Sequence, residues 1–238
     1  KDGLACLDRP DTILINIHIW RSEMTGNEML STLGLRLEDP SESSFTQAAK
    51  LDALNIAQKS VVNLIHNAYL GELQVIDEGK AMTANALDIS IGGDLTEEVM
   101  RNGIIAVYDA TDGVWCTMID PGDQKRLENS YLAGSASNPV AYIFSNKLFV
   151  DGPGATDDVD VWYLRSPADI EADGNECSLN VALHESVVDL AESQLWKMDA
   201  KADRASAAYA NGKEQIDTLN ARYLGERPKG IGTASRQL

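Results

Sequence analysis

The stretch SLNVALHESVVDLAESQLWKMDAKADRASAAYANGKEQIDTLNARY, residues 178–223, decides the fold. Its apolar residues recur at steps of three and four, which predicts two amphipathic helices that each bury one face. A short break at residues 198–201 separates them, and Asp199 is predicted to cap the second helix. The stretch therefore predicts a helical hairpin whose apolar faces carry no obvious catalytic residue. The predicted buried faces comprise Leu183, Val187, Leu190, Ala191, Gln194, Leu195 and Met198, then Ala202, Ala205, Tyr209, Gly212, Ile216, Leu219 and Tyr223.

Two more helices are predicted nearer the N-terminus. Residues 25–28 have the spacing of a capping box, and the helix that follows must end before Pro40. A longer helix opens at residues 44–47, with Gly71 as its C-terminal cap. The predicted buried residues are Met29, Leu30, Leu33 and Leu37 in the first helix, and Leu51, Leu54, Ala57, Val61, Leu64, Ile65 and Ala68 in the second.

Residues 74–162 have a different pattern, in which short β-branched or alternating runs are separated by turn residues. Asp112-Gly113 is a good signal for a two-residue β-hairpin, and Asn146-Lys147 is a weaker one. Residues 151–158 are acidic and rich in turn residues, which indicates a loop. The candidate strands are residues 87–91, 104–108, 114–119, 140–144, 148–150 and 159–164.

The two ends of the chain differ from the rest. Isoleucine alternates with other residues over 13–19, which predicts a strand that joins the later β-region or the edge of a neighbouring subunit. Residues 224–238 are basic and contain Pro and Gly, which predicts an extended arm that orders on a partner.

The predicted fold class is α+β: an antiparallel helical bundle with an inserted all-β subdomain and an extended C-terminal arm. The predicted division is an extension at 1–23, the first half of the bundle at 24–73, the β-domain at 74–174, the helical hairpin at 175–223 and the arm at 224–238.

Composition limits the classes of function. A net charge of −17 on 238 residues predicts a surface that repels nucleic acid. Cys6, Cys116 and Cys177 are widely spaced, which indicates neither a disulfide framework nor a zinc site and favours assembly in a reducing, intracellular setting. The apolar run at 13–19 is too short to span a bilayer and lacks the flanks of a signal peptide, so no membrane association is expected.

The sequence offers no convincing catalytic, cofactor or metal site. His184-Glu185 lacks the second histidine of a zinc protease, so a histidine on a helix surface is expected instead. Asp157, Asp158 and Asp160 resemble a calcium loop in composition, but the glycine and glutamate of such a loop are missing. A solvated acidic loop is therefore expected there, and no metal is predicted.

Three aromatic residues are candidate interface anchors, because aromatic rings supply large contact areas with few rotamers to freeze. They are Trp162, Tyr163 and Trp196, and core filling is the equal alternative for each.

Several of these segments resemble the head-to-tail adaptor (connector) proteins of tailed bacteriophages and related gene-transfer particles. LRLEDP at 35–40, Phe45-Thr46 and the Leu-Asn-x-x-Gln pattern within 51–58 are similar to that family's opening helices. The resemblance covers residues 24–223, with the β-region similar in arrangement more than in residues, and residues 1–23 depart from the pattern. Near the C-terminus the similar positions are VWYLRSP at 161–167, Leu179-Asn180, His184-Glu185, Ala191-Glu192 and residues 203–209.

This resemblance implies a virion protein of the phage neck, assembled in the host cytoplasm and without enzyme activity or a cofactor. It implies a dodecameric ring that binds the portal protein, offers a platform to a tail or nozzle protein, and lets DNA pass without specific binding. We expect Asp157, Asp158 and Asp160 to line the channel for DNA ejection in part, because negative walls repel phosphate. The residues of the arm that we expect to bind the portal are Arg227, Lys229, Ile231, Arg236 and Leu238.

Two alternatives remain open at the level of sequence. One is a hydrolase with an inserted β-domain that acts on cell-wall polymer, which requires a cleft with converging carboxylates of raised pKa. The other is a tail-completion protein, which the long helices disfavour.

Overall fold

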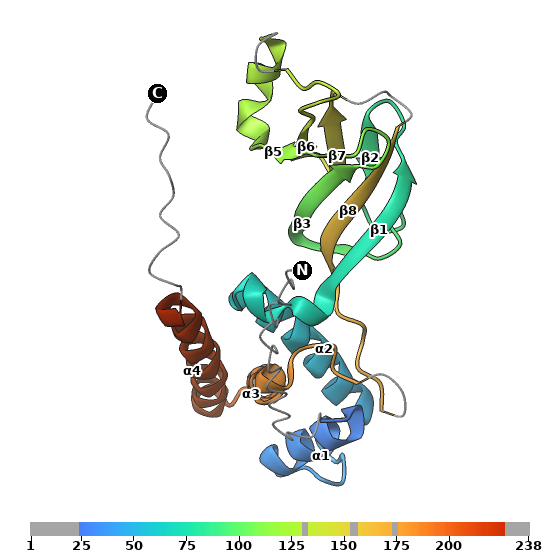
Figure 1. Cartoon of the computed structure of the whole chain (residues 1–238). Coiled ribbons are helices and arrows are strands. Elements are labelled where there is room, and N and C mark those ends of the chain that lie inside the picture. The colour runs from blue at the N-terminus through green and yellow to red at the C-terminus, as the bar shows by residue number, and fades with distance from the viewer. Residues whose placement is uncertain (1–23, 130–132, 153–156, 173–175, 227–238) are drawn as a thin grey trace, which may run out of the picture.

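The chain is a mixed α+β protein with the α-helices gathered at one end and two mostly antiparallel sheets at the other, where the 3-10 helix η3, Pro121–Glu128, also lies (Figure 1). The structure, a computed structural model, describes residues 24–129, 133–152, 157–172 and 176–226. Within these residues no helix is long and apolar enough to cross a membrane. Two predictions concern residues outside these ranges: the strand at 13–19 and the portal-binding arm residues Arg227, Lys229, Ile231, Arg236 and Leu238.

Helix α1, Gly26–Arg36, begins as the sequence predicts. Thr25 Oγ1 accepts a hydrogen bond from the backbone N–H of Glu28, and Glu28 Oε2 accepts one from the backbone N–H of Thr25. This reciprocal pair is the predicted capping box. The apolar face of α1 is buried from Met29 to Leu37, as expected.

Helix α2, Gln47–Leu64, is shorter at both ends than predicted. Its cap is Thr46, whose hydroxyl accepts from Ala49 N, and it ends before Ile65 instead of near Gly71. The early end has a tertiary cause, because the Asn220 side chain accepts from His66 N at 2.8 Å and donates to Leu64 O at 3.0 Å. Asn220 thus satisfies backbone groups that another helical turn would have used. Leu64 and Ala68, predicted to be buried, are exposed as a result.

Helices α3, His184–Met198, and α4, Ala202–Glu226, form the predicted helical hairpin. The role of Asp199 was predicted wrongly, since this residue is the C-cap of α3, and Ala200 turns the chain at a φ of +56°. Three residues predicted to be buried are exposed near this turn, namely Met198, Ala202 and Tyr209. Two short 3-10 helices, η1 at Asn67–Tyr69 and η2 at Gly71–Leu73, lead from α2 to the first strand.

The four helices share one hydrophobic core. This core also includes residues of the segment that follows the last strand, β8 at Asp158–Arg165. Two hydrogen bonds hold that segment against α2: Gln58 Nε2 donates to Ala168 O, and Asn55 Oδ1 accepts from Ile170 N. The largest fully buried side chains of this core include Met29, Leu33, Leu54, Ile65, Leu70, Leu73, Leu164, Ile170 and Leu183.

In the part of the chain that the structure describes, eight strands form two four-stranded sheets. The first sheet has the order β1-β8-β3-β4 and the second has the order β2-β7-β6-β5, and of these neighbouring pairs only β5–β6 is parallel. A second hydrophobic core lies between the inward faces of the sheets and includes Leu87, Val107, Leu148, Val161 and Tyr163. The bounds are β1 Gln74–Ala81, β2 Ala86–Asp88, β3 Val99–Asp109, β4 Val114–Trp115, β5 Thr117–Met118, β6 Val140–Phe144, β7 Lys147–Asp151 and β8 Asp158–Arg165.

The strand predictions differ from the structure in informative ways. β1 was not predicted, because its polar and glycine residues give no alternation of apolar side chains. The predicted strand at 114–119 is split at Cys116 into β4 and β5, which belong to different sheets. The other predicted strands are present, with ends that differ by a few residues in most cases.

Neither hairpin signal marks a two-residue turn at the predicted position: Asp112-Gly113 lies in a longer connection, and the turn predicted at Asn146-Lys147 lies one residue earlier. Asp112-Gly113 lies in a four-residue connection, because Asp109 pairs with Val114. Phe144 pairs with Lys147, so Ser145 and Asn146 form a two-residue turn, with φ values of +51° and +59°. Positive φ at both positions is what a type I′ hairpin turn requires.

Candidate functional site

The surface best suited to binding is the outer face of the first sheet, which we call the aromatic face. It consists of Ile76, Ile105, Tyr108, Trp115 and Trp162. Trp162 on β8 stands opposite Ile76 on β1, and Tyr108 on β3 stands opposite Trp115 on β4. The strands β1, β8, β3 and β4 thus place Ile76, Trp162, Tyr108 and Trp115 on one side of the sheet. Ile105 is exposed on β3, at the irregularity in register between Ile104 and Ala106.

The rings of the aromatic face pack against one another and still remain accessible. The ring centroids of Trp115 and Trp162 are 4.9 Å apart, and those of Tyr108 and Trp115 are 5.1 Å apart. Trp115 nevertheless exposes 57% of its surface, Ile76 exposes 47% and Ile105 exposes 45%. A preformed cluster of this kind can dock on an apolar partner with little loss of side-chain entropy.

Only one of the three predicted interface anchors belongs to this face. Trp162 is half-buried, whereas Tyr163 is fully buried and donates its hydroxyl to Asp77 Oδ2 at 3.2 Å. Its burial raises the pKa of the Tyr163 phenol. Trp196 is also buried, where it meets Phe45 edge-on and donates Nε1–H to Glu192 Oε1 at 3.0 Å. Tyr163 and Trp196 therefore fill the cores, which was the alternative for both.

The three acidic residues predicted to act together, Asp157, Asp158 and Asp160, do not lie on one surface. Asp158 and Asp160 point to the same side of β8 as Trp162, because side chains alternate along a strand. Asp160 Oδ1 accepts a hydrogen bond from Gly79 N at 2.8 Å. Asp157 precedes the strand and lies instead beside Asp109 and Asp112 of the β3–β4 connection.

A second, partly apolar surface lies on the helices, and we call it the helical patch. Its exposed apolar residues are Leu64 of α2 and Tyr209 of α4, with Leu190 of α3 buried beneath them. They line a cavity of about 330 Å³ together with the polar residues Ser60, Asn63, Ser193, Gln194 and Lys197. Ser193, on the same cavity, has a buried hydroxyl without a hydrogen-bond partner in the structure. Leu64 and Tyr209 were predicted to be core residues, so this surface was not predicted from the sequence.

A polar groove of about 990 Å³ lies between α1, α3 and α4. Arg36 binds Asp189 and Glu185, with the Arg36 Nη2 to Glu185 Oε2 distance at 2.5 Å, and Gln215 Nε2 donates to Asp189 Oδ2 at 2.9 Å. Burial raises the pKa of the Asp189 carboxyl, although Arg36 opposes the shift. Both carboxylate oxygens of Asp189 are engaged, so the network connects three helices.

His184 was expected on a helix surface, and the structure corrects this. It is buried, its Nδ1 accepts from Met24 N at 3.2 Å, and its Nε2 donates to Leu179 O at 2.9 Å. Both ring nitrogens are satisfied, so His184 joins the start of α1 to the start of α3 as a structural residue.

Comparison with known proteins gives no match: no protein-family model matches the chain, and neither does any curated protein sequence. Its function is therefore inferred from its own residues and surfaces.

Proposed function

We propose that this chain is a structural ring component of a phage neck, which joins the portal to the tail and lets DNA pass. The observation that carries the proposal is the pair of apolar surfaces, the aromatic face on the first sheet and the helical patch, which lie on separate cores. Exposed apolar clusters of this kind mark sites of protein association.

Two different apolar surfaces suit a head-to-tail ring better than a two-fold dimer. A dimer interface uses the same patch on both subunits, whereas a ring needs two patches that complement each other. In the proposed ring, the aromatic face of one subunit packs on the helical patch of the next. The number of subunits, twelve, follows the resemblance to adaptor proteins alone.

The proposed architecture is an antiparallel helical bundle with an inserted all-β subdomain, which supports such a ring. The helical core draws its members from residues 29–73 and 164–216, and the core between the sheets draws on residues 82–163. Each core thus presents one of the two surfaces. The arm, predicted at 224–238, is proposed to reach the portal, although residues 224–226 belong to α4 and are not extended as predicted.

The net charge of −17 supports the passage of DNA, because an acidic wall does not retain phosphates. We assign Asp158 and Asp160, which precede Trp162 on the outer face of β8, to a position near the channel. The proposed partners are the portal, a tail or nozzle protein and further copies of this chain, in a virion assembled in the host cytoplasm.

The ring is tested by the mass of the purified chain in solution, with and without portal protein, and by electron microscopy. We expect discrete rings for the parent. Trp115→Ser should weaken each subunit contact by about 2 kcal/mol, roughly thirtyfold, and shift the population to monomer, because it removes the centre of the aromatic face.

Ile91→Ser is the matched control, because Ile91 is exposed and lies outside both surfaces. It should leave the rings intact. A parent chain that stays monomeric at all concentrations, with or without portal, would contradict the proposal. Release of soluble fragments from purified cell-wall polymer would instead support the hydrolase alternative.

A further inference from the structure

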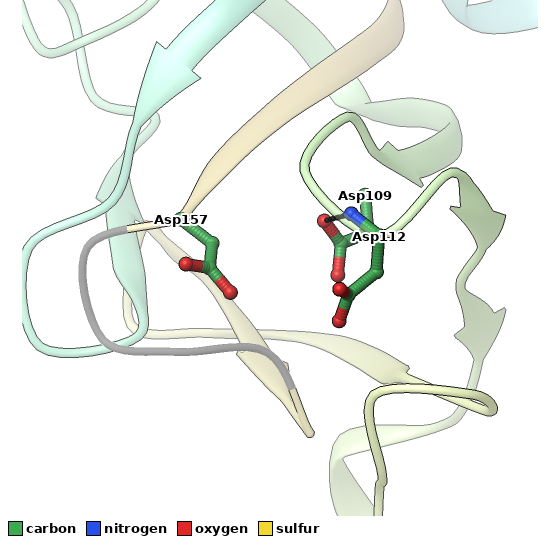
Figure 2. Close-up of side chains that lie close together, drawn as sticks. All are labelled: Asp109, Asp112 and Asp157. Carbon is green, nitrogen blue, oxygen red and sulfur yellow. Dashed lines mark hydrogen bonds between the residues drawn. The ribbon is translucent and has the colours of Figure 1, made fainter.

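Three carboxylates from two separate parts of the sequence meet at the end of the first sheet (Figure 2). Asp109 is the last residue of β3, Asp112 lies in the connection to β4, and Asp157 directly precedes β8. One oxygen from each side chain can be chosen so that all three lie within 4.8 Å of one another.

The backbone of two neighbouring strands creates this arrangement. β3 pairs with β8 so that Asp109 faces Val159, and Ala110 N donates to Asp158 O at 3.0 Å. Asp158 N in turn donates to Thr111 Oγ1 at 3.1 Å, which holds the start of β8 against the β3–β4 connection. Asp157 is therefore held beside Asp109 by main-chain pairing.

The two oxygens of Asp109 differ in their surroundings. Oδ1 accepts from the backbone N–H groups of Thr111 and Asp112, at 3.0 Å and 3.1 Å, and so shapes the turn. Oδ2 is buried and has no hydrogen-bond partner, although Asp109 is 0% exposed. In Figure 2 this second oxygen points toward the carboxylate of Asp112.

A buried carboxylate oxygen without a donor is costly, and a neighbouring carboxylate makes it more so, because like charges repel. A cation would relieve both costs. The three side chains of this group offer only carboxylate oxygens as ligands, and hard cations prefer oxygen.

We propose that Asp109, Asp112 and Asp157 bind one Ca²⁺ ion. Calcium–oxygen distances of about 2.4 Å allow two ligand oxygens to lie up to about 4.8 Å apart across the ion, which the observed spacing meets. Water completes the coordination. The ion joins the β3–β4 connection to the start of β8. The acidic group predicted from sequence, Asp157, Asp158 and Asp160, is a different set, of which only Asp157 takes part.

The test uses the full chain, freed of metal with a chelator, and measures thermal unfolding and the heat of Ca²⁺ binding. We expect one ion per chain and a rise in Tm of about 5 °C or more at a hundredfold excess over Kd. Asp112→Asn and Asp157→Asn should each weaken binding at least tenfold. Without metal, both variants should melt at a higher temperature than the parent, because they remove a repelling charge.

Asp158→Asn is the matched control, since it removes the same charge one residue away from Asp157 and should keep full Ca²⁺ binding. Mg²⁺ at equal ionic strength measures general screening of the acidic surface, and should raise Tm by less than half as much as Ca²⁺. The proposal is overturned if Ca²⁺ gives no binding heat below about 1 mM, or if Asp157→Asn responds to Ca²⁺ as the parent does.

Discussion

Asp39 shows how much of the local structure can depend on one side chain. It is almost fully buried between α1 and α2, and Ser43, Ser44 and Phe45 donate hydrogen bonds from their backbone N–H groups to its carboxylate. Lys50 Nζ lies 3.6 Å from Asp39 Oδ2. Burial by itself would raise the pKa of this carboxyl, but these hydrogen bonds hold the pKa well below its usual range.

A depressed pKa in the folded chain means that Asp39 stabilises the fold when it is ionised. That contribution is fully present above the ordinary pKa of 3.8 and is lost as the pH falls toward the lower folded value. We therefore expect Asp39→Asn to lower the free energy of unfolding at neutral pH, and the difference from the parent to shrink below about pH 4. Urea unfolding across this range measures it.

Asp52→Asn provides the comparison, because Asp52 is exposed on α2. Its effect should be small at every pH. A difference between Asp39→Asn and the parent that stays constant from neutral to acidic pH would show that the charge of Asp39 is not what stabilises the connection.

At the scale of the elements, the close packing of α3 on α4 depends on Gly212. A Cβ atom placed on Gly212 would lie 3.0 Å from Asp189 Cβ and 3.2 Å from Ser186 O. Both distances are tighter than ordinary van der Waals contact, so a larger side chain must push the two helices apart. The hydrogen bonds of Gln215 to Ser186 and Asp189 cross the same contact.

Gly212→Val should therefore destabilise the chain by about 1–3 kcal/mol through overpacking. Ala210→Val is the control, because Ala210 is exposed on the same helix and the branched side chain has a similar intrinsic cost there. Equal melting temperatures for the two variants would mean that α4 can move away from α3 without loss.

The elements also show what the sequence could predict. α1, α3 and α4 were predictable because their apolar residues follow the helical period over many turns. The end of α2 depends on Asn220 and the strand β1 depends on its pairing with β8, and neither partner is near in sequence. Local patterns cannot reveal such long-range causes.

The candidate sites, too, depend on contacts between residues that are far apart in the sequence. Trp162 could be selected as an aromatic residue, but its neighbour Trp115 and the grouping of Asp109 with Asp157 require the register of β3, β4 and β8. Tyr163 could have been assigned to the core from the alternation of Val159 and Val161, once the side of the strand was known.

At the scale of the whole molecule, two hydrophobic cores lie in one chain, and we predict that they unfold in separate steps. Leu190→Asp places an unpaired charge in the helical core, and Val161→Asp does the same between the sheets. Each should cost several kcal/mol and shift only the calorimetric transition of its own core.

Ile56→Asp and Ile91→Asp are the matched controls, because both isoleucines are exposed. They should leave the transitions nearly unchanged. A single transition that both core variants shift equally would show instead that the two cores unfold as one cooperative unit.

The pairing of β1 with β8 at the end nearest the helices affects how force passes between the sheets and the helices. Gln74 pairs with Leu164, so the two backbone segments that run between the sheets and the helices do so side by side (Figure 1). Paired strands are about 4.8 Å apart, and twisting about one of them must shear the other. A single linker would act as a swivel. With two, a torque applied to the sheets is passed on to the helices.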